Sequence, residues 1–250
     1  MSGRAELSRS FGQVAEEYDR WRPSYPGEAV AWVADNVEGR RAAEIGAGTG
    51  KATVQFLRFG FSVTAVEPDR AMVEVGKARV PAAEWLVATA ESWRPQPETF
   101  DLLYGAQSWH WVDERSDSEL AQAIIPGGMM AWLWNHPSLH IETEVLGDIY
   151  ARYMPESDES LRNANHRRQP AYWQERMERV MADVEVLEVP WERTLSAADY
   201  VSLTGTYSDH ITLAPDDRRA LQEAVRQRLE LQGGSITLEY LTRVYLGVRR

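Results

Sequence analysis

Apolar residues along this chain gather in short runs that alternate with segments of helical periodicity. The runs predict seven strands, at 41–46, 62–67, 84–89, 100–106, 128–135, 184–189 and 237–248. The periodic segments predict helices at 51–59, 71–79, 115–125, 197–206 and 215–231, with Asp69 as the N-cap of the second. Strands therefore alternate with helices over the first half of the chain.

This alternation predicts an α/β fold with a Rossmann-like, doubly wound and mainly parallel sheet. Right-handed crossovers bring the carboxyl ends of such strands to one edge, where ligands bind. No repeat, low-complexity tract or linker divides the chain, so we expect a single domain over 1–250. Its expected parts are an N-terminal helical cap (1–38), a core (40–135), a helical insertion or lid (136–182) and a C-terminal part of the sheet with helices (183–250).

Composition narrows the classes of partner. Lys and Arg number 27 and Asp and Glu 38, so the net charge of −11 disfavours binding to nucleic acid. The absence of cysteine excludes disulfides and thiolate metal sites. No secretory leader and no apolar run near the ~20 residues of a membrane span is visible, so we expect a cytoplasmic protein without a membrane partner. Pro137 separates His136 from His140 and no carboxylate cluster accompanies them, so no metal is expected.

A glycine-rich turn, EIGAGTG at 44–50, stands where the first strand passes into a helix. Glu67 ends the next strand, 67 − 46 = 21 residues after Gly46, and a carboxylate at that distance commonly binds ribose hydroxyls. Lys51 occupies the position where the dinucleotide fingerprint needs its last glycine. Neither Ile45 nor Ala52 fits a phosphate-binding P-loop, so a nucleoside ligand without a pyrophosphate is favoured.

S-adenosylmethionine (SAM) is such a ligand, because it carries a sulfonium, an ammonium and a single carboxylate. Glu44 near that ammonium would be chemically favourable, whereas beside a pyrophosphate it would repel. The alternative is that Glu44 is a structural acid that accepts hydrogen bonds within a tight turn.

Five segments in order, EIGAGTG (44–50), VEPDRAM (66–72), ATAESW (88–93), FDLLYGAQSWHWVD (100–113) and IIPGGMMAW (124–132), resemble class I SAM-dependent methyltransferases. Within that superfamily, AEEYDRWRPSYP (15–26), QSWHWVD and ADYVSLTGTYSD (198–209) are similar to the methyltransferase type 11 or trans-aconitate methyltransferase-like group. The resemblance implies a seven-stranded sheet with an antiparallel C-terminal strand. It also implies SAM as cofactor and S-adenosylhomocysteine (SAH) as its product.

The turn and the resemblance together nominate cofactor-binding residues. These are Tyr18, Glu44, Gly46, Ala47, Gly48, Gly50, Glu67, Pro68, Met72, Thr89, Ala90, Glu91, Ala106 and Gln107. The resemblance implies that Pro68 and Met72 pack on the adenine and that Tyr18 closes over the cofactor. Many relatives have an acid where Thr89 stands, so the adenine amino group is expected to meet Thr89, Glu91 or a backbone carbonyl.

The end of the strand at 100–106 carries the candidate acceptor site. Trp109 and Trp111 would exclude water and hold a flat or apolar acceptor; if the strand continued, they would alternate and only one would face it. His110 is the candidate catalytic base, the alternative being a packed loop residue. Arg22 is a candidate ligand for an acceptor carboxylate or else a structural arginine, and Tyr25 is equally open.

These observations favour O-methylation of a small molecule, with a carboxylate as the acceptor group. The [DN]PP[YF] motif of enzymes that methylate nucleic-acid bases is absent after the fourth strand. Three alternatives stay open: hydroxyl, phenol or nitrogen methylation with His110 as base, a nicotinamide oxidoreductase, and a non-catalytic binding protein of the same fold. The pattern is compatible with a monomer or a homodimer.

Overall fold

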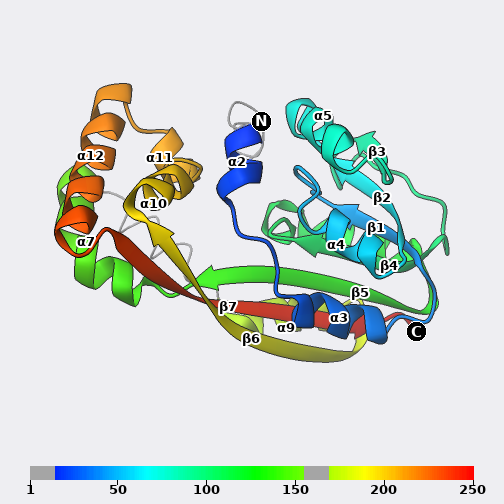
Figure 1. Cartoon of the computed structure of the whole chain (residues 1–250). Coiled ribbons are helices and arrows are strands. Elements are labelled where there is room, and N and C mark those ends of the chain that lie inside the picture. Colours follow the sequence, from blue (N-terminus) through cyan, green and yellow to red (C-terminus); the bar gives the residue numbers. More distant parts are fainter. Residues whose placement is uncertain (1–14, 155–168) are drawn as a thin grey trace.

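A seven-stranded sheet organises the computed structural model, which describes residues 15–154 and 169–250 (Figure 1). The strands are β1 (Arg41–Ile45), β2 (Ser62–Glu67), β3 (Glu84–Val87), β4 (Phe100–Ala106), β5 (Ile124–Pro137), β6 (Ala182–Ser196) and β7 (Ser235–Val248). Their order is β3-β2-β1-β4-β5-β7-β6. The strand β7 runs antiparallel to both β5 and β6, and the other neighbouring pairs are parallel. The prediction of a mainly parallel, seven-stranded, Rossmann-like sheet is therefore confirmed.

Helices cover both faces of this sheet, so its central strands are buried on both sides. One face packs on α3 (Gly27–Asp35) and α4 (Thr53–Arg58), and the opposite face packs on α6 (Asp117–Gln122) and α9 (Pro170–Glu178). Successive side chains of β5 show the alternation: Trp132 lies in one apolar core and Leu133 in the other. The helix α5 (Arg70–Arg79) follows β2, and Asp69 caps it as predicted by accepting the backbone N–H groups of Ala71 and Met72.

The strands β5, β6 and β7 are longer than the other four, and their protruding ends carry a helical cap (Figure 1). It consists of α7 (Leu139–Tyr153), α10 (Ala197–Thr204), α11 (Ser208–Ile211) and α12 (Pro215–Leu231), around a third apolar core. The N-terminal helix α2 (Ala15–Trp21) contacts both α10 of this cap and α5 of the sheet region. The expected lid segment is thus divided, because α7 belongs to the cap and α9 to a face of the sheet. Residues 1–14 of the expected N-terminal cap and 155–168 of the expected lid lie outside the described residues.

Two strands are longer than the sequence pattern indicates. In β5, Ile124 pairs with Phe100 and Met129 with Leu102, so the Pro-Gly-Gly segment between them forms a bulge within the strand rather than a turn before it. The preceding helix consequently ends at Gln122. In β6, pairing with β7 continues through Pro190, which is tolerated because β6 is the edge strand of the sheet.

Candidate functional site

Three glycines shape the turn between β1 and α4. Gly46, Gly48 and Gly50 have φ angles of +69°, +57° and +86°, in the left-handed region that side chains disfavour. A Cβ at Gly46 would lie 2.5 Å from the Cβ of Ser108, so the turn also packs tightly against the segment after β4. A Cβ at Gly48 would meet nothing within 4 Å. The turn therefore leaves open space at Gly48 where a ligand can approach the backbone.

The turn is tied to the end of β2 by four hydrogen bonds. The carbonyl of Val66 accepts from the N–H groups of both Gly46 (2.8 Å) and Ala47 (3.1 Å). The carboxylate of Glu67 accepts from the N–H of Gly48 (2.9 Å) through Oε2 and from the N–H of Asp69 (2.9 Å) through Oε1. Each oxygen keeps a lone pair, so Glu67 can still accept two hydroxyl groups side by side.

Two buried carboxyl groups give this edge of the sheet its electrostatic character. Glu67 is 6% exposed, and burial raises its pKa to about 7. Glu44 is 1% exposed, and burial raises its pKa to about 8 although it accepts hydrogen bonds from Thr53 Oγ1 (2.5 Å) and Tyr104 Oη (2.9 Å). Glu44 thus has the hydrogen bonds that the alternative role, a buried structural acid, requires. A cation bound nearby would favour the ionised form of both groups.

The helix α2 is anchored directly on the glycine turn. Asp19 accepts a hydrogen bond from Thr49 Oγ1 (2.8 Å) and forms an ion pair with Arg79. Lys51 donates to the backbone carbonyl of Asp19, so this lysine holds α2 in place instead of being solvated. Burial raises the pKa of Tyr18, and the nearby carboxylates of Glu67 and Glu44 raise it further. Tyr18 therefore lies within electrostatic reach of both buried acids.

The loops after β3 and β4 meet the same edge, since all parallel strands end there. Met72 and Ala90 are buried, Pro68 and Ala106 are half-buried, and Glu91 accepts a hydrogen bond from the backbone of Asp113. Thr89 forms a local turn, in which its N–H donates to Ser92 Oγ (3.0 Å). Gln107 has a φ of +56° and donates from Nε2 to the carbonyl of Asn135 (2.9 Å). The residues expected to bind the cofactor are therefore brought to one edge of the sheet.

The segment after β4 is a 3₁₀ turn, Trp109–Trp111, and the strand does not continue through it. Trp109 is fully buried, stacks on Trp132 at a centroid distance of 5.0 Å and donates to Asp117 Oδ1 (3.0 Å). Arg176 holds the same carboxylate in a buried ion pair (2.6 Å). The indole of Trp109 thus lies in the core beneath the site, and its contact with an acceptor stays a prediction.

His110 is half-buried and packs against Trp111, with ring centroids 4.8 Å apart. Its Nδ1 accepts a long hydrogen bond from Trp134 Nε1 (3.4 Å). A neutral imidazole that accepts at Nδ1 carries its proton on Nε2, so Nε2 is a donor. This geometry favours the packed-loop interpretation of His110 over a catalytic base.

Arg22 and Tyr25, the two expected acceptor ligands near the N-terminus, lie in different surroundings: Arg22 contacts the helical cap and Tyr25 lies in the core. Arg22 donates from Nε to Thr206 Oγ1 and from Nη2 to the Thr206 carbonyl, both at 2.9 Å. Tyr25 is buried in the core beside α3, and the negative charge of Glu44 contributes to raising its pKa after the larger effect of burial. Sequence reasoning missed the partner of Arg22, because nothing in the local pattern indicates that residues 184 positions apart meet.

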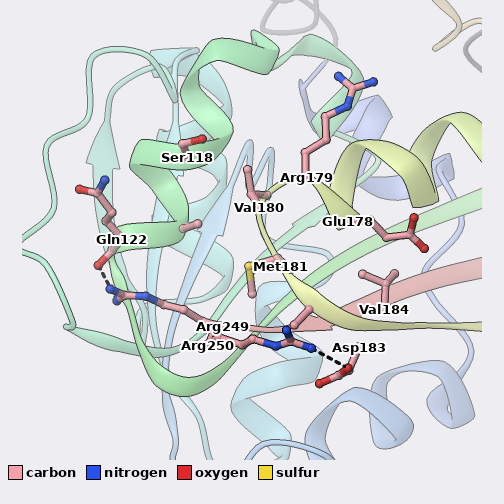
Figure 2. A pocket seen from close by; sticks show the side chains of 12 residues that line it. Ser118, Gln122, Glu178, Arg179, Val180, Met181, Asp183, Val184, Arg249 and Arg250 are labelled. Atoms are coloured by element: carbon pink, nitrogen blue, oxygen red, sulfur yellow. Dashed lines mark hydrogen bonds and ion pairs between the residues drawn. The ribbon is translucent and has the colours of Figure 1, made fainter.

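Two clefts lie near β5, one at each end of the strand. One, of about 760 Å³, is lined by α6, the end of α9 and the last residues of the chain, where Arg250 pairs with Asp183 and Arg249 donates to the Gln122 carbonyl (Figure 2). It lies at the amino end of β5, away from the glycine turn. The other, of about 730 Å³, lies at the carboxyl end of β5 beside Trp191 and Tyr240.

In the described part of the chain, no group of three or more metal-binding side chains gathers, and no helix has the length and apolarity to cross a membrane.

Comparison with known proteins agrees with this geometry. Residues 43–132 match the family model described as a methyltransferase domain. An uncharacterised methyltransferase of Mycobacterium tuberculosis is 40% identical over 133 residues, which are 53% of this chain and 54% of that protein. A trans-aconitate 2-methyltransferase of Paracidovorax citrulli is 36% identical over 120 residues, 46% of this chain and 45% of that protein. The chain thus spans about half the length of the curated relatives it matches.

Two solved structures share the fold over most of this chain. A protein of Anaeromyxobacter dehalogenans described as a type II methyltransferase has a TM-score of 0.64 at 21% identity, over 91% of this chain and 97% of that one. Phosphoethanolamine N-methyltransferase 2 of Haemonchus contortus, solved with SAM, has a TM-score of 0.59 at 16% identity, over 100% of this chain and 60% of that one. At these identities the likeness shows the fold alone. The expected resemblance to methyltransferases is therefore borne out in sequence over residues 43–132, and in fold over most of the chain.

The buried acids predict how stability changes with pH. Glu44 and Glu67 have pKa values of about 8 and about 7 in the folded protein, raised from 4.5, so the folded state binds more protons than the unfolded state between these limits. The free energy of unfolding should therefore fall as pH rises from 5 to 8, by about 1.4 kcal/mol for each pH unit over which one carboxyl is protonated only when folded. Urea denaturation at pH 5, 6, 7 and 8 measures this slope.

Two variants assign the slope to these groups. Glu44→Gln should make it shallower, whereas Glu185→Gln, at an exposed position on β6, should leave it unchanged. An equal slope in Glu44→Gln and in the unaltered protein would contradict the assignment.

Proposed function

We propose that this chain, whose residues 43–132 match a methyltransferase domain and whose fold is shared with methyltransferases, transfers the methyl group of SAM to a small carboxylate-bearing acceptor. The observation that carries the proposal is the clamp between Glu67 and the N–H of Gly48, beside which the backbone is open. A vicinal diol fits the free lone pairs of Glu67, and the open face of Gly48 admits the rest of a nucleoside.

The residues at the sheet edge fit SAM by charge as well as by shape. SAM supplies an electrophilic methyl group on a sulfonium, and its ammonium adds a second positive charge. Glu44 and Glu67 would favour those charges in their ionised forms, and Tyr18 on α2 would cover the bound molecule. Pro68, Met72 and the loop 89–91 would surround the adenine. Gly46, Ala47, Gly50, Ala106 and Gln107 would complete the contact with the methionine portion.

A carboxylate acceptor suits this site because it needs no base. Carboxylates are ionised at pH 7, so positioning and the exclusion of water are sufficient to promote their methylation. Nδ1 of His110 accepts an indole N–H from Trp134, so that nitrogen is already engaged in this arrangement. Arg22 brings a positive charge to the same side of α2 as Tyr18. Partial matches to trans-aconitate 2-methyltransferases and the net charge of −11 support a small acid as acceptor over nucleic acid.

A matched pair of glycine substitutions tests cofactor binding. Gly48 and Gly60 both have positive φ, and a Cβ at either meets nothing within 4 Å, so alanine should cost about 1 kcal/mol of stability at each. SAH at 100 times its Kd should stabilise the unaltered protein and Gly60→Ala by about 2.7 kcal/mol. Gly48→Ala should lose that stabilisation, because its Cβ occupies the ligand's space. Thermal unfolding with SAH, and with NAD as the control, measures the difference; stabilisation by NAD alone would refute the proposal.

Substitution of His110 separates a carboxylate acceptor from one that needs a base. His110→Ala should retain kcat within about 10-fold once an acceptor is in hand, because no proton has to be removed in the transition state. The methylated product should be a base-labile ester. A loss of about 10²-fold or more in kcat, together with a base-stable product, would instead support methylation of a hydroxyl, phenol or nitrogen with His110 as base.

A further inference from the structure

A group of polar side chains lies between the end of α2 and the helical cap. We call it the cap cluster and define it as Arg22, Glu142, Tyr207, His210 and Tyr240. It draws on α2's end, α7, the α10–α11 connection, α11 and β7. Tyr207 is at its centre, with the guanidinium of Arg22 4.4 Å above its ring and the ring of His210 6.0 Å away, edge on.

Two atoms of this cluster are buried without a hydrogen bond among the described residues. They are Nδ1 of His210, whose residue is 2% exposed, and Oη of Tyr240, whose residue is 5% exposed. Burial raises the pKa of Tyr240, and a weak interaction with the Tyr207 side chain lowers it, although no Tyr207–Tyr240 contact has the distance and angles of a hydrogen bond. Unsatisfied buried polar groups are costly and rare, so two in one cluster indicate a missing hydrogen-bonding partner.

The charges of the cluster limit what that partner can be. Arg22 uses the Nε N–H and one N–H of Nη2 on Thr206, which leaves the Nη1 N–H groups and the second N–H of Nη2 as donors among the described contacts. Glu142 stands on the other side, where it accepts from Tyr200 Oη (2.7 Å) and where its charge raises the pKa of Tyr207 and Tyr240. Arg22 is the one cationic side chain of the cluster, so a second carboxylate on a ligand would find no cation in the cluster and would face Glu142.

The position of Arg22 connects the cluster to the cofactor edge. Its guanidinium lies 5.3 Å above the ring of Tyr18, and the charge of Glu67 in turn affects the pKa of Tyr18. Arg22 therefore packs on the tyrosine that lies within electrostatic reach of Glu67.

We propose that the cap cluster is the acceptor-recognition site, and that it selects a monocarboxylic acid bearing a hydroxyl group over a polycarboxylic acid. This inference rests on the proposed methyltransferase function. Arg22 binds the carboxylate, and Tyr240 Oη with His210 Nδ1 binds the neutral polar group. Burial lowers the pKa of His210, so its imidazole is neutral at pH 7 and Nδ1 can accept a hydrogen bond from a hydroxyl group.

The stability of two matched tyrosine variants tests whether Tyr240 is kept for a ligand. Tyr240→Phe removes a buried hydroxyl that has no hydrogen bond, so its Tm should equal or exceed that of the unaltered protein. Tyr200→Phe removes a hydroxyl bonded to Glu142, so its Tm should fall by a few degrees. A Tm loss in Tyr240→Phe as large as that in Tyr200→Phe would assign the hydroxyl a structural role and overturn the inference.

Binding to the SAH-saturated protein tests selectivity, with 4-hydroxyphenylacetate, phenylacetate and trans-aconitate as probes in titration calorimetry. 4-Hydroxyphenylacetate should bind at least 10-fold more tightly than trans-aconitate. Tyr240→Phe should weaken the binding of the hydroxylated probe about 10-fold and leave the binding of phenylacetate and SAH unaffected. Arg22→Gln should weaken the binding of both monocarboxylates.

Tighter binding of trans-aconitate, or no binding of either monocarboxylate to a protein that binds SAH, would overturn the inference. Failure to bind SAH itself would instead refute the proposed function on which the inference rests.

Discussion

The hydrogen bond from the N–H of Gly48 to Glu67 is the contact on which the site depends. It joins the turn after β1 to the end of β2, and it requires the left-handed backbone that glycine permits at that position. The turn so held presents Thr49 to Asp19, and this contact anchors α2. Because α2 also binds the cap through Arg22, one backbone conformation orients the cofactor edge and the acceptor side together.

Local chemistry made most of the sheet predictable. The apolar runs of β2 and β4 match the observed strands residue for residue, because both are buried on two faces and end at an acid or at the turn residues that follow. Asp69 could be identified as a helix cap from its place before a helical segment, and the structure shows both of its hydrogen bonds. The glycine turn could be located for the same reason, since only glycine suits its backbone.

Contacts between distant parts of the chain could not be predicted in this way. Trp109 was expected at the acceptor site, yet its indole bonds to Asp117 in the core, because the backbone turns after β4 where the pattern suggested a continuing strand. Lys51 stands at a helix start in the sequence but holds α2. The cap cluster was missed altogether, because its members come from segments that only the long β5–β7 ribbon brings together.

The central claim is that buried acids at the carboxyl edge of the sheet hold a nucleoside that carries an ammonium group, as SAM and SAH both do. Titration calorimetry of SAH at pH 7, in two buffers of different ionisation enthalpy, tests it most directly. Glu44 and Glu67 have pKa values of about 8 and about 7 without ligand, so binding of the ammonium should drive protons off them. The account predicts that SAH binds and releases protons to the buffer. No binding, or binding with no proton release, would contradict it.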